Sequence, residues 1–213
     1  IGTTAAVGAR NVTVTSIANG PSNILTGAFT VVAPTLVSID PSTGLRGTTV
    51  ALTLTGTNLA GATGVTVSGT GVLCTIAGTP TATTVNANCA VGIGAGLTAR
   101  SITVTSTTNG PSNILASAFT VVAPSLTAVS PSSGSRGTTV ALTLTGTNLA
   151  GATAVTVAGG GVTCTITGTP TATTVTANCT IGLAAALGAR NVTVTTTTNG
   201  SSNVLLGAFT VLL

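Results

Sequence analysis

A repeat of ninety residues constrains this chain more than any other feature of its sequence. Two residue types mark the period in matching contexts: Arg10, Arg100 and Arg190, and Phe29, Phe119 and Phe209. No insertion or deletion separates the copies. A period of this length exceeds that of a solenoid repeat and suits whole β-sandwich domains in tandem. We therefore expect a partial unit at 1–32 and full units at 33–122 and 123–213.

Strict alternation within a unit identifies its strands. In residues 49–55, Val50, Leu52 and Leu54 lie on one face of the expected strand, and small or hydroxylated side chains lie on the other. The same pattern, bounded by Gly, Pro and Asn turns, places strands in the second unit near 35–39, 49–55, 64–68, 72–77, 83–90, 101–106 and 113–122. Helical periodicity is absent. The sequence predicts an all-β protein of tandem Ig-like β-sandwich domains with about seven strands each.

The first 32 residues hold only the end of a unit. We expect a strand at 11–16, a turn at 19–21 and the final strand at 24–32. These last two strands lack the opening strands that would cover them, which leaves an apolar face and unpaired edges. One interpretation is that a longer array continues upstream of Ile1. The other is that the pair adds to the sheet of another subunit by β-strand addition.

The composition argues against catalysis. Charged residues make up 3% of the chain, there is no His, the basic residues are all Arg, and Asp40 is the one acid. General acid–base catalysis needs such side chains in a pocket, so we expect no enzyme, no cofactor and no metal site. Scattered arginines without aromatic neighbours argue against nucleic acid. The apolar runs fall short of the ~20 residues of a membrane span.

Four cysteines form two pairs with identical spacing. Cys74 and Cys89 lie on either side of an expected hairpin centred on residues 80–83, and Cys164 and Cys179 repeat them. Opposed Cα atoms of paired strands lie about 4.5–5.5 Å apart, which suits a disulfide. Zinc would have to gather cysteines from two domains. We predict the disulfides Cys74–Cys89 and Cys164–Cys179, and hence an oxidising compartment, extracellular or at the cell surface.

The five arginines are the candidate contact residues. Arg46 and Arg136 lie in a Gly-flanked turn, while Arg10, Arg100 and Arg190 precede the penultimate strand of each unit. In one interpretation they form a row of cationic contacts for an anionic glycan or a neighbouring subunit. In the other, each arginine hydrogen-bonds loop carbonyls or covers apolar surface.

Turn and strand motifs of the full units resemble those of a known family. Residues 34–50 follow the pattern Pro-x-Leu-x-x-Ile-x-Pro-x-x-Gly-x-x-Gly-Thr-Thr-Val, residues 56–59 read Gly-Thr-Asn-Leu, and the unit closes with Asn-Gly-x-Ser-Asn at 109–113 and Phe-Thr-Val at 119–121. The chain resembles the IPT/TIG group of immunoglobulin-like domains. The resemblance implies repeats of a bacterial or archaeal surface or extracellular protein, with no catalytic residues. Family members that bind DNA use basic loops, which this chain lacks.

We expect a structural repeat protein of an extracellular filament, stalk or surface layer. A nearly uncharged surface lacks the repulsion that keeps monomers apart, which favours self-association into a polymer or array. The alternatives are an adhesin or carbohydrate-binding module, with a glycan as partner, and spacer domains of a secreted enzyme. A binding module should carry exposed aromatic or clustered polar side chains in its loops, whereas these loops are Gly, Thr, Ser and Ala.

Overall fold

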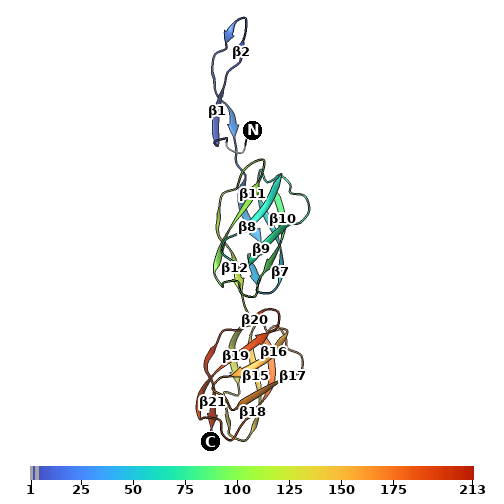
Figure 1. Cartoon of the computed structure of the whole chain (residues 1–213), viewed down its shortest axis with the longest axis vertical. Helices are drawn as coiled ribbons and strands as arrows, with labels where there is room; N and C mark the ends of the chain where they lie inside the picture. Colours follow the sequence, from blue (N-terminus) through green and yellow to red (C-terminus); the bar gives the residue numbers. More distant parts are fainter. Residues whose placement is uncertain (1, 3–4) are drawn as a thin grey trace. The chain divides into compact units, whose positions relative to one another are not determined.

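The computed structural model describes residue 2 and residues 5–213, and in this part of the chain all regular structure is β-strand. The chain divides into two compact units (Figure 1). The first comprises Ile1–Gly44, Thr49–Ala90 and Thr98–Thr120, and the second Leu45–Thr48, Val91–Leu97 and Val121–Leu213. The division of the sequence into one partial and two full repeats stays a prediction.

The first β-sandwich is built from strands β5 to β12. Their bounds are β5 (Thr35–Asp40), β6 (Thr43–Leu45), β7 (Thr49–Thr57), β8 (Ala62–Val67), β9 (Val72–Ile76), β10 (Thr84–Val91), β11 (Ala99–Ser106) and β12 (Leu115–Val122). One sheet has the order β5-β7-β10-β9 and the other β6-β12-β11-β8. This is the arrangement of an Ig-like sandwich.

The second sandwich repeats the first strand for strand. Its strands are β13 (Ser125–Ser130), β14 (Ser133–Ser135), β15 (Thr139–Thr147), β16 (Ala152–Val157), β17 (Val162–Thr167), β18 (Thr174–Ile181), β19 (Gly188–Thr196), β20 (Gly200–Ser201) and β21 (Leu205–Leu212). The sheets have the orders β13-β15-β18-β17 and β14-β21-β19-β16, and β20 pairs with β19. The predicted all-β, Ig-like fold class is confirmed.

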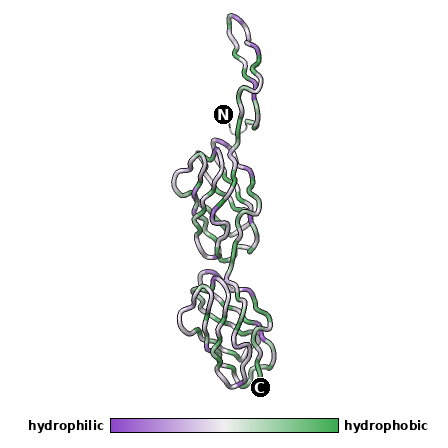
Figure 2. Tube along the Cα trace, turned by 180° about the vertical axis from the view of Figure 1, so that it is seen from behind, coloured by the Kyte–Doolittle hydropathy of each residue, from purple (hydrophilic) through white to green (hydrophobic). Residues whose placement is uncertain are grey.

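Alternation along the strands builds the core between the two sheets (Figure 2). On β7, Leu52 and Leu54 are buried and Thr53 is exposed. Across the ladder they pair with Ala87 and Val85 of β10, which are also buried. Phe119, the largest buried side chain of this sandwich, comes from the opposite sheet. A one-residue slip in register would move every one of these side chains to the solvent face.

The short strands β6 and β14 were not predicted. Each follows a proline at which the chain leaves one sheet for the other, Pro41 in the first sandwich and Pro131 in the second. β14 pairs in parallel with β21, and Gly134 lies opposite Val211. Three residues centred on glycine are too few for an alternation analysis to detect, and the Pro/Ser/Gly composition is that of a turn.

The N-terminal segment forms a separate ladder of short strands, labelled in part in Figure 1. Its strands are β1 (Gly8–Val12), β2 (Thr15–Ser16), β3 (Gly20–Pro21) and β4 (Leu25–Val31). β1 pairs with β4 and β2 with β3, both antiparallel. The strand expected at 11–16 is thus divided and begins earlier, at Gly8, while the expected final strand at 24–32 is present as β4.

Gly56 should not tolerate a side chain, because the backbone of the neighbouring strand β5 approaches it closely at an irregularity in their pairing. A Cβ atom at Gly56 would lie 1.9 Å from the carbonyl oxygen of Thr35. We expect Gly56→Ala to lower the free energy of unfolding by about 1–3 kcal/mol, the range for overpacking. Gly94→Ala is the matched control, since a Cβ there meets nothing within 4 Å. Urea unfolding followed by circular dichroism measures both; equal midpoints would contradict the close approach.

Candidate functional site

The four cysteines form two disulfides in the pairs that the hairpin register predicts. Cys74 is bonded to Cys89 and Cys164 to Cys179, with a Cα–Cα distance of 4.0 Å in each pair. In the second sandwich the two cysteines lie directly opposite each other on β17 and β18. Both bridges therefore join neighbouring strands of one sheet and tie an edge strand, β9 or β17, to the strand beside it.

Disulfide bonding removes the thiol reactivity of all four cysteines. Cys89 and Cys179 are fully buried in the cores, and no cysteine is free. Disulfide sulfurs have no thiolate to act as nucleophile or metal ligand. Among the described residues, no group of three or more His, Cys, Asp or Glu side chains could hold a metal ion.

Arg46 and Arg136 hold a loop of their own unit. Nε of Arg46 donates to the carbonyl oxygen of Ala95 at 2.6 Å, and Nε of Arg136 donates to that of Ala185 at 2.5 Å. Both side chains are half-buried. The geometry of this pair agrees with the interpretation in which arginines bind loop carbonyls.

Arg100 and Arg190 lie deeper, with only 4% and 8% of their surfaces exposed. Nη1 of Arg100 donates to the carbonyl oxygen of Ser68 at 2.7 Å, and Nη1 of Arg190 donates to that of Ala158 at 2.9 Å. The next residue is a glycine in both turns, and a Cβ atom at Gly159 would lie 1.7 Å from Nη1 of Arg190. The guanidinium group thus packs onto a turn in which only glycine fits.

Arg10 occupies the equivalent position in the N-terminal ladder but is exposed. Its Nη2 donates to the carbonyl oxygen of Ala6. Arg190 makes the same local bond, to Ala186, in addition to its bond across the sandwich. Of the five candidate arginines, Arg10 is the one whose side chain faces solvent.

The hydrophobic side chains of the ladder are exposed as well. Phe29 is 45% exposed, and Val14 is 68% exposed. Their equivalents Phe119 and Val104, ninety residues later, are 0% and 1% exposed. We call the side chains of Val12, Val14 and Phe29 the uncovered face, because no second sheet lies over them among the described residues.

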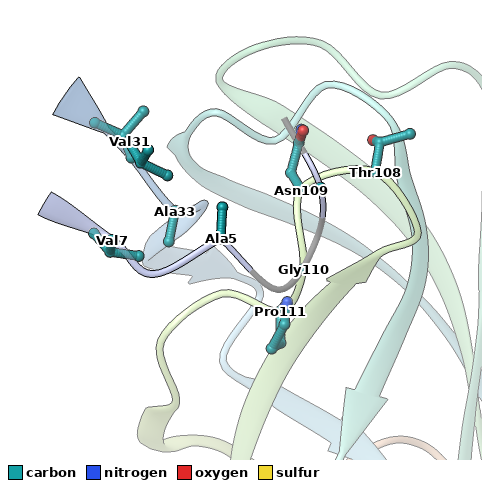
Figure 3. Close-up of a pocket in the computed structure, with 10 residues that line it drawn as sticks. Ala5, Val7, Val31, Ala33, Thr108, Asn109, Gly110 and Pro111 are labelled. Atoms are coloured by element: carbon teal, nitrogen blue, oxygen red, sulfur yellow. The ribbon is translucent and has the colours of Figure 1, made fainter. Parts of the chain in front are cut away.

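A small hollow lies beside the end of this ladder (Figure 3). Its volume is about 300 Å³, and its lining includes Val7, Val31, Ala33 and the turn Thr108–Pro111. Within the turn, the amide of Asn109 donates to the carbonyl oxygen of Ala60. No ionisable side chain lines the hollow among the described residues. Its described lining combines small apolar side chains with the uncharged side chains of Thr108 and Asn109.

Two asparagines that the sequence interpretation did not select hold the sandwiches together. Oδ1 of Asn113 accepts from the backbone N–H of Leu36 at 2.6 Å, and its Nδ2 donates to the carbonyl oxygen of Leu36 at 3.0 Å. Asn203 makes the same two bonds to Leu126. The dipeptide Ser-Asn recurs every ninety residues, and this recurrence is the sequence signal that could have identified both asparagines.

The fold and these contacts define a protein of tandem Ig-like sandwiches, each closed by one intrasheet disulfide. Residues 124–211 match the sequence profile of the IPT/TIG domain. Residues 34–121 are its counterpart in the repeat and have the same strand order. Comparison with curated proteins gives no match. No helix of the described residues is long and apolar enough to cross a membrane.

Three solved structures illustrate what the chain is similar to. The extracellular region of plexin A4 is 19% identical, with 84% of this chain and 18% of that chain covered and a TM-score of 0.38. SGBP-B of Bacteroides ovatus, in complex with a mixed-linkage heptasaccharide, is 18% identical over 78% of this chain and 41% of that chain, with a TM-score of 0.31. Domains 5–6 of the S-layer protein SbsC are 14% identical over 84% and 98%, with a TM-score of 0.28. The chain spans less than a fifth of the plexin chain.

Removing one bridge should destabilise its own sandwich. Each disulfide closes a loop with a sequence separation of 15, so we expect Cys74→Ser with Cys89→Ser to cost about 3 kcal/mol of unfolding free energy in the chain-entropy model. Guanidinium unfolding measures the loss. The exposed neighbour Ala90→Ser is the control. A wild-type midpoint that does not change under reducing conditions would contradict the prediction.

Substitution of equivalent arginines should lower the free energy of unfolding at the buried position and leave it nearly unchanged at the exposed one. Arg100→Met removes the donor to the carbonyl oxygen of Ser68, a part-buried hydrogen bond from a charged group, and should lower the free energy of unfolding by about 1–3 kcal/mol. Arg10→Met, at the exposed equivalent, should change the free energy of unfolding by less than about 0.5 kcal/mol. Thermal unfolding of the two variants provides the comparison. Equal destabilisation would mean that Arg10 is also held by the fold.

Proposed function

We propose that this chain is a structural repeat of an extracellular assembly, in which its sandwiches pack side by side. The observation that carries the proposal is a hydroxyl-rich outer face on the sheet formed by β5, β7, β10 and β9, where Asp40 is the one charged side chain, and its uncharged counterpart in the second sandwich. We call this surface the threonine face. Its exposed side chains are Thr49, Thr53, Thr55, Thr57, Asn86 and Asn88, and Thr139, Thr143, Thr145, Thr147, Thr176, Asn178 and Thr180.

The threonine face is suited to contact with another face of the same kind. It presents methyl groups, hydroxyls and amides in register, such as Thr53 opposite Asn86 and Thr143 opposite Thr176. Asp40, opposite Thr53, is its one charged side chain, and its counterpart in the second sandwich has none, so two copies meet with little electrostatic repulsion and little desolvation of ions. The central strands of the other sheet differ, because outer residues such as Ser101, Thr103 and Thr120 are half-buried.

Two features of the structure favour a structural role over catalysis or ligand recognition. The aromatic side chains of the two sandwiches, Phe119 and Phe209, are fully buried, which leaves no aromatic platform for a sugar ring. Arg46, Arg100 and Arg190 donate to backbone carbonyl groups of other loops in their own sandwich. The proposal therefore includes no catalysis. The two disulfides support an oxidising, extracellular location.

Charges placed on the threonine face should prevent assembly. We expect the chain to form particles larger than a monomer at high concentration, and expect Thr55→Lys with Thr145→Lys, whose cross-strand neighbours are uncharged, to abolish them by like-charge repulsion. Sedimentation velocity and electron microscopy measure the particles.

The matched control places the same charges on the other sheet. Thr66 and Thr156 are exposed on the outer faces of β8 and β16, so Thr66→Lys with Thr156→Lys should leave assembly unchanged. A strictly monomeric wild-type chain at all concentrations would overturn the proposal, and so would equal loss of assembly in both lysine variants.

A further inference from the structure

We propose that the edge strands β9 and β17 each pair with the same strand of a second copy of this chain, antiparallel and centred on the cysteine of the strand. Such a joint has twofold symmetry and turns two four-stranded sheets into one continuous sheet. The inference rests on the proposed function, because it names the edge through which copies join within the assembly. It depends only on the two complete sandwiches.

β17 presents a row of unpaired backbone groups along the open edge of its sheet. In an antiparallel ladder, hydrogen-bonded pairs alternate with closer pairs that are not hydrogen-bonded. The Cα atoms of Cys164 and Cys179 lie 4.0 Å apart, which is close to the spacing of the second kind. Three positions along the same register, the N–H of Gly182 donates to the carbonyl oxygen of Gly161 at 2.7 Å. The N–H and carbonyl of Cys164 therefore point away from β18, as do those of the residues two before and two after it.

These outward groups have no partner within the chain. In the part that the structure describes, the backbone groups of Val162, Cys164 and Ile166 on the open side of β17 make no hydrogen bond. The hydroxyl groups of Thr163 and Thr165, on the outer face of the same strand, make none with the described residues either. An edge of this kind is a template for strand addition.

The other edges of the second sandwich are protected. On β13 the register is irregular between Leu126 and Ala128, and Asn203 occupies the N–H and the carbonyl of Leu126. β16, at the edge of the other sheet, has an irregularity of its own, and β14 is three residues long. Short strands, bulges and occupied backbone groups blunt an edge. β17 has none of these devices: its residues Val162–Thr167 pair with β18 in unbroken register and include no glycine, proline or charged residue.

The sequence of the edge identifies the same strand of a second copy as its partner. From Val162 onward it reads Val-Thr-Cys-Thr-Ile, which is nearly the same in both directions. When two copies pair antiparallel about Cys164, Thr163 lies opposite Thr165 of the second copy, and the flanking β-branched aliphatic residues lie opposite each other. Threonine pairs and β-branched pairs of this kind stabilise antiparallel strands. Neither β17 nor β18 carries a charge, so the two copies meet without repulsion at this edge.

β9 has the same edge with one substitution. It reads Val-Leu-Cys-Thr-Ile about Cys74, and the N–H of Ala77 donates to the carbonyl oxygen of Asn86 at 2.8 Å, which leaves the backbone groups of Cys74 pointing outward. Leu73 is 73% exposed. In the twofold pair Leu73 lies against Thr75 of the second copy, which removes apolar surface from water. Because each chain has two such edges, pairing at both links copies beyond a dimer.

Cysteine cross-linking tests the register in the full chain. We expect a mixture of chains carrying Thr163→Cys and chains carrying Thr165→Cys to form an intermolecular disulfide with oxidised glutathione, because the two positions are directly opposed. Each variant alone should give about a tenth of that yield or less, since a position and its own copy lie on a diagonal about 7–8 Å apart, too far for a disulfide. Non-reducing electrophoresis measures the yield, and peptide mass spectrometry identifies the bond.

The matched control uses a central strand. Thr143→Cys and Thr145→Cys are exposed on β15, which an edge joint keeps away from the second copy. A yield for the mixture of Thr163→Cys and Thr165→Cys chains that exceeds the yields of the single variants and of the control pair supports the joint. Equal yields in the single variants, or assembly without this cross-link, overturn the joint and leave the proposed function standing. A chain that stays monomeric at all concentrations overturns both.

Charge pairs give a second measurement that needs no new cysteine. Thr163→Lys with Thr165→Lys places lysines opposite each other across a β17 joint. Leu73→Lys with Thr75→Lys does the same across a β9 joint, and the four changes together should weaken association about tenfold or more. Glutamate in place of lysine at 75 and 165 sets opposite charges against each other and should recover most of the association. Sedimentation velocity measures association, and thermal unfolding establishes that both variants fold. Equal loss in both variants overturns the joint, because packing through the threonine face alone does not distinguish them.

Discussion

Each sandwich depends on its last two long strands, β11 and β12 or β19 and β21, being covered by the six strands that precede them. We call this pair of strands the closing hairpin. The closing hairpin brings the one phenylalanine of each sandwich, Phe119 or Phe209, between two sheets whose remaining core is small and aliphatic. Burial of such a side chain contributes about 1.5–3 kcal/mol, and the two phenylalanines are the largest of the fully buried side chains. Among the described residues, the N-terminal copy has the same hairpin without a second sheet over it: the ladder keeps its register, while Phe29 is 45% exposed. Local hydrogen bonds set the conformation, and coverage supplies the core.

Much of the fold could be predicted because its signals are periodic. Alternation in residues 49–55 identified the strand whose leucines face the core, and the ninety-residue period identified its copy. The cysteine pairing followed from hairpin arithmetic, since opposed residues are equidistant from the turn. Pattern analysis succeeds where one physical cause, burial of every second side chain, acts over many residues.

Other features depend on contacts between distant segments and carry no local period. β6 exists because β12 lies beside it, and its sequence has the composition of a turn. The burial of Arg100 depends on the turn at Ser68, and the role of Asn113 depends on the backbone of Leu36, 77 residues away in sequence. The sequence left both interpretations of the arginines open, because no neighbouring residue distinguishes an arginine that hydrogen-bonds loop carbonyls from one that is exposed for contact with a partner.

The position of the bridges has a mechanical consequence. Tension applied to the ends of a repeat acts on its first strand, β5, and its last, β12, whereas the bridge joins β9 to β10 in the middle of the sequence. A sandwich pulled open would still retain the residues between Cys74 and Cys89 as a closed loop. At about 3.3–3.6 Å per extended residue, that loop withholds about 50 Å of chain from each repeat. The bridge thereby limits how far a stretched array can lengthen, and it keeps a folded hairpin as a template from which the sheet can reform.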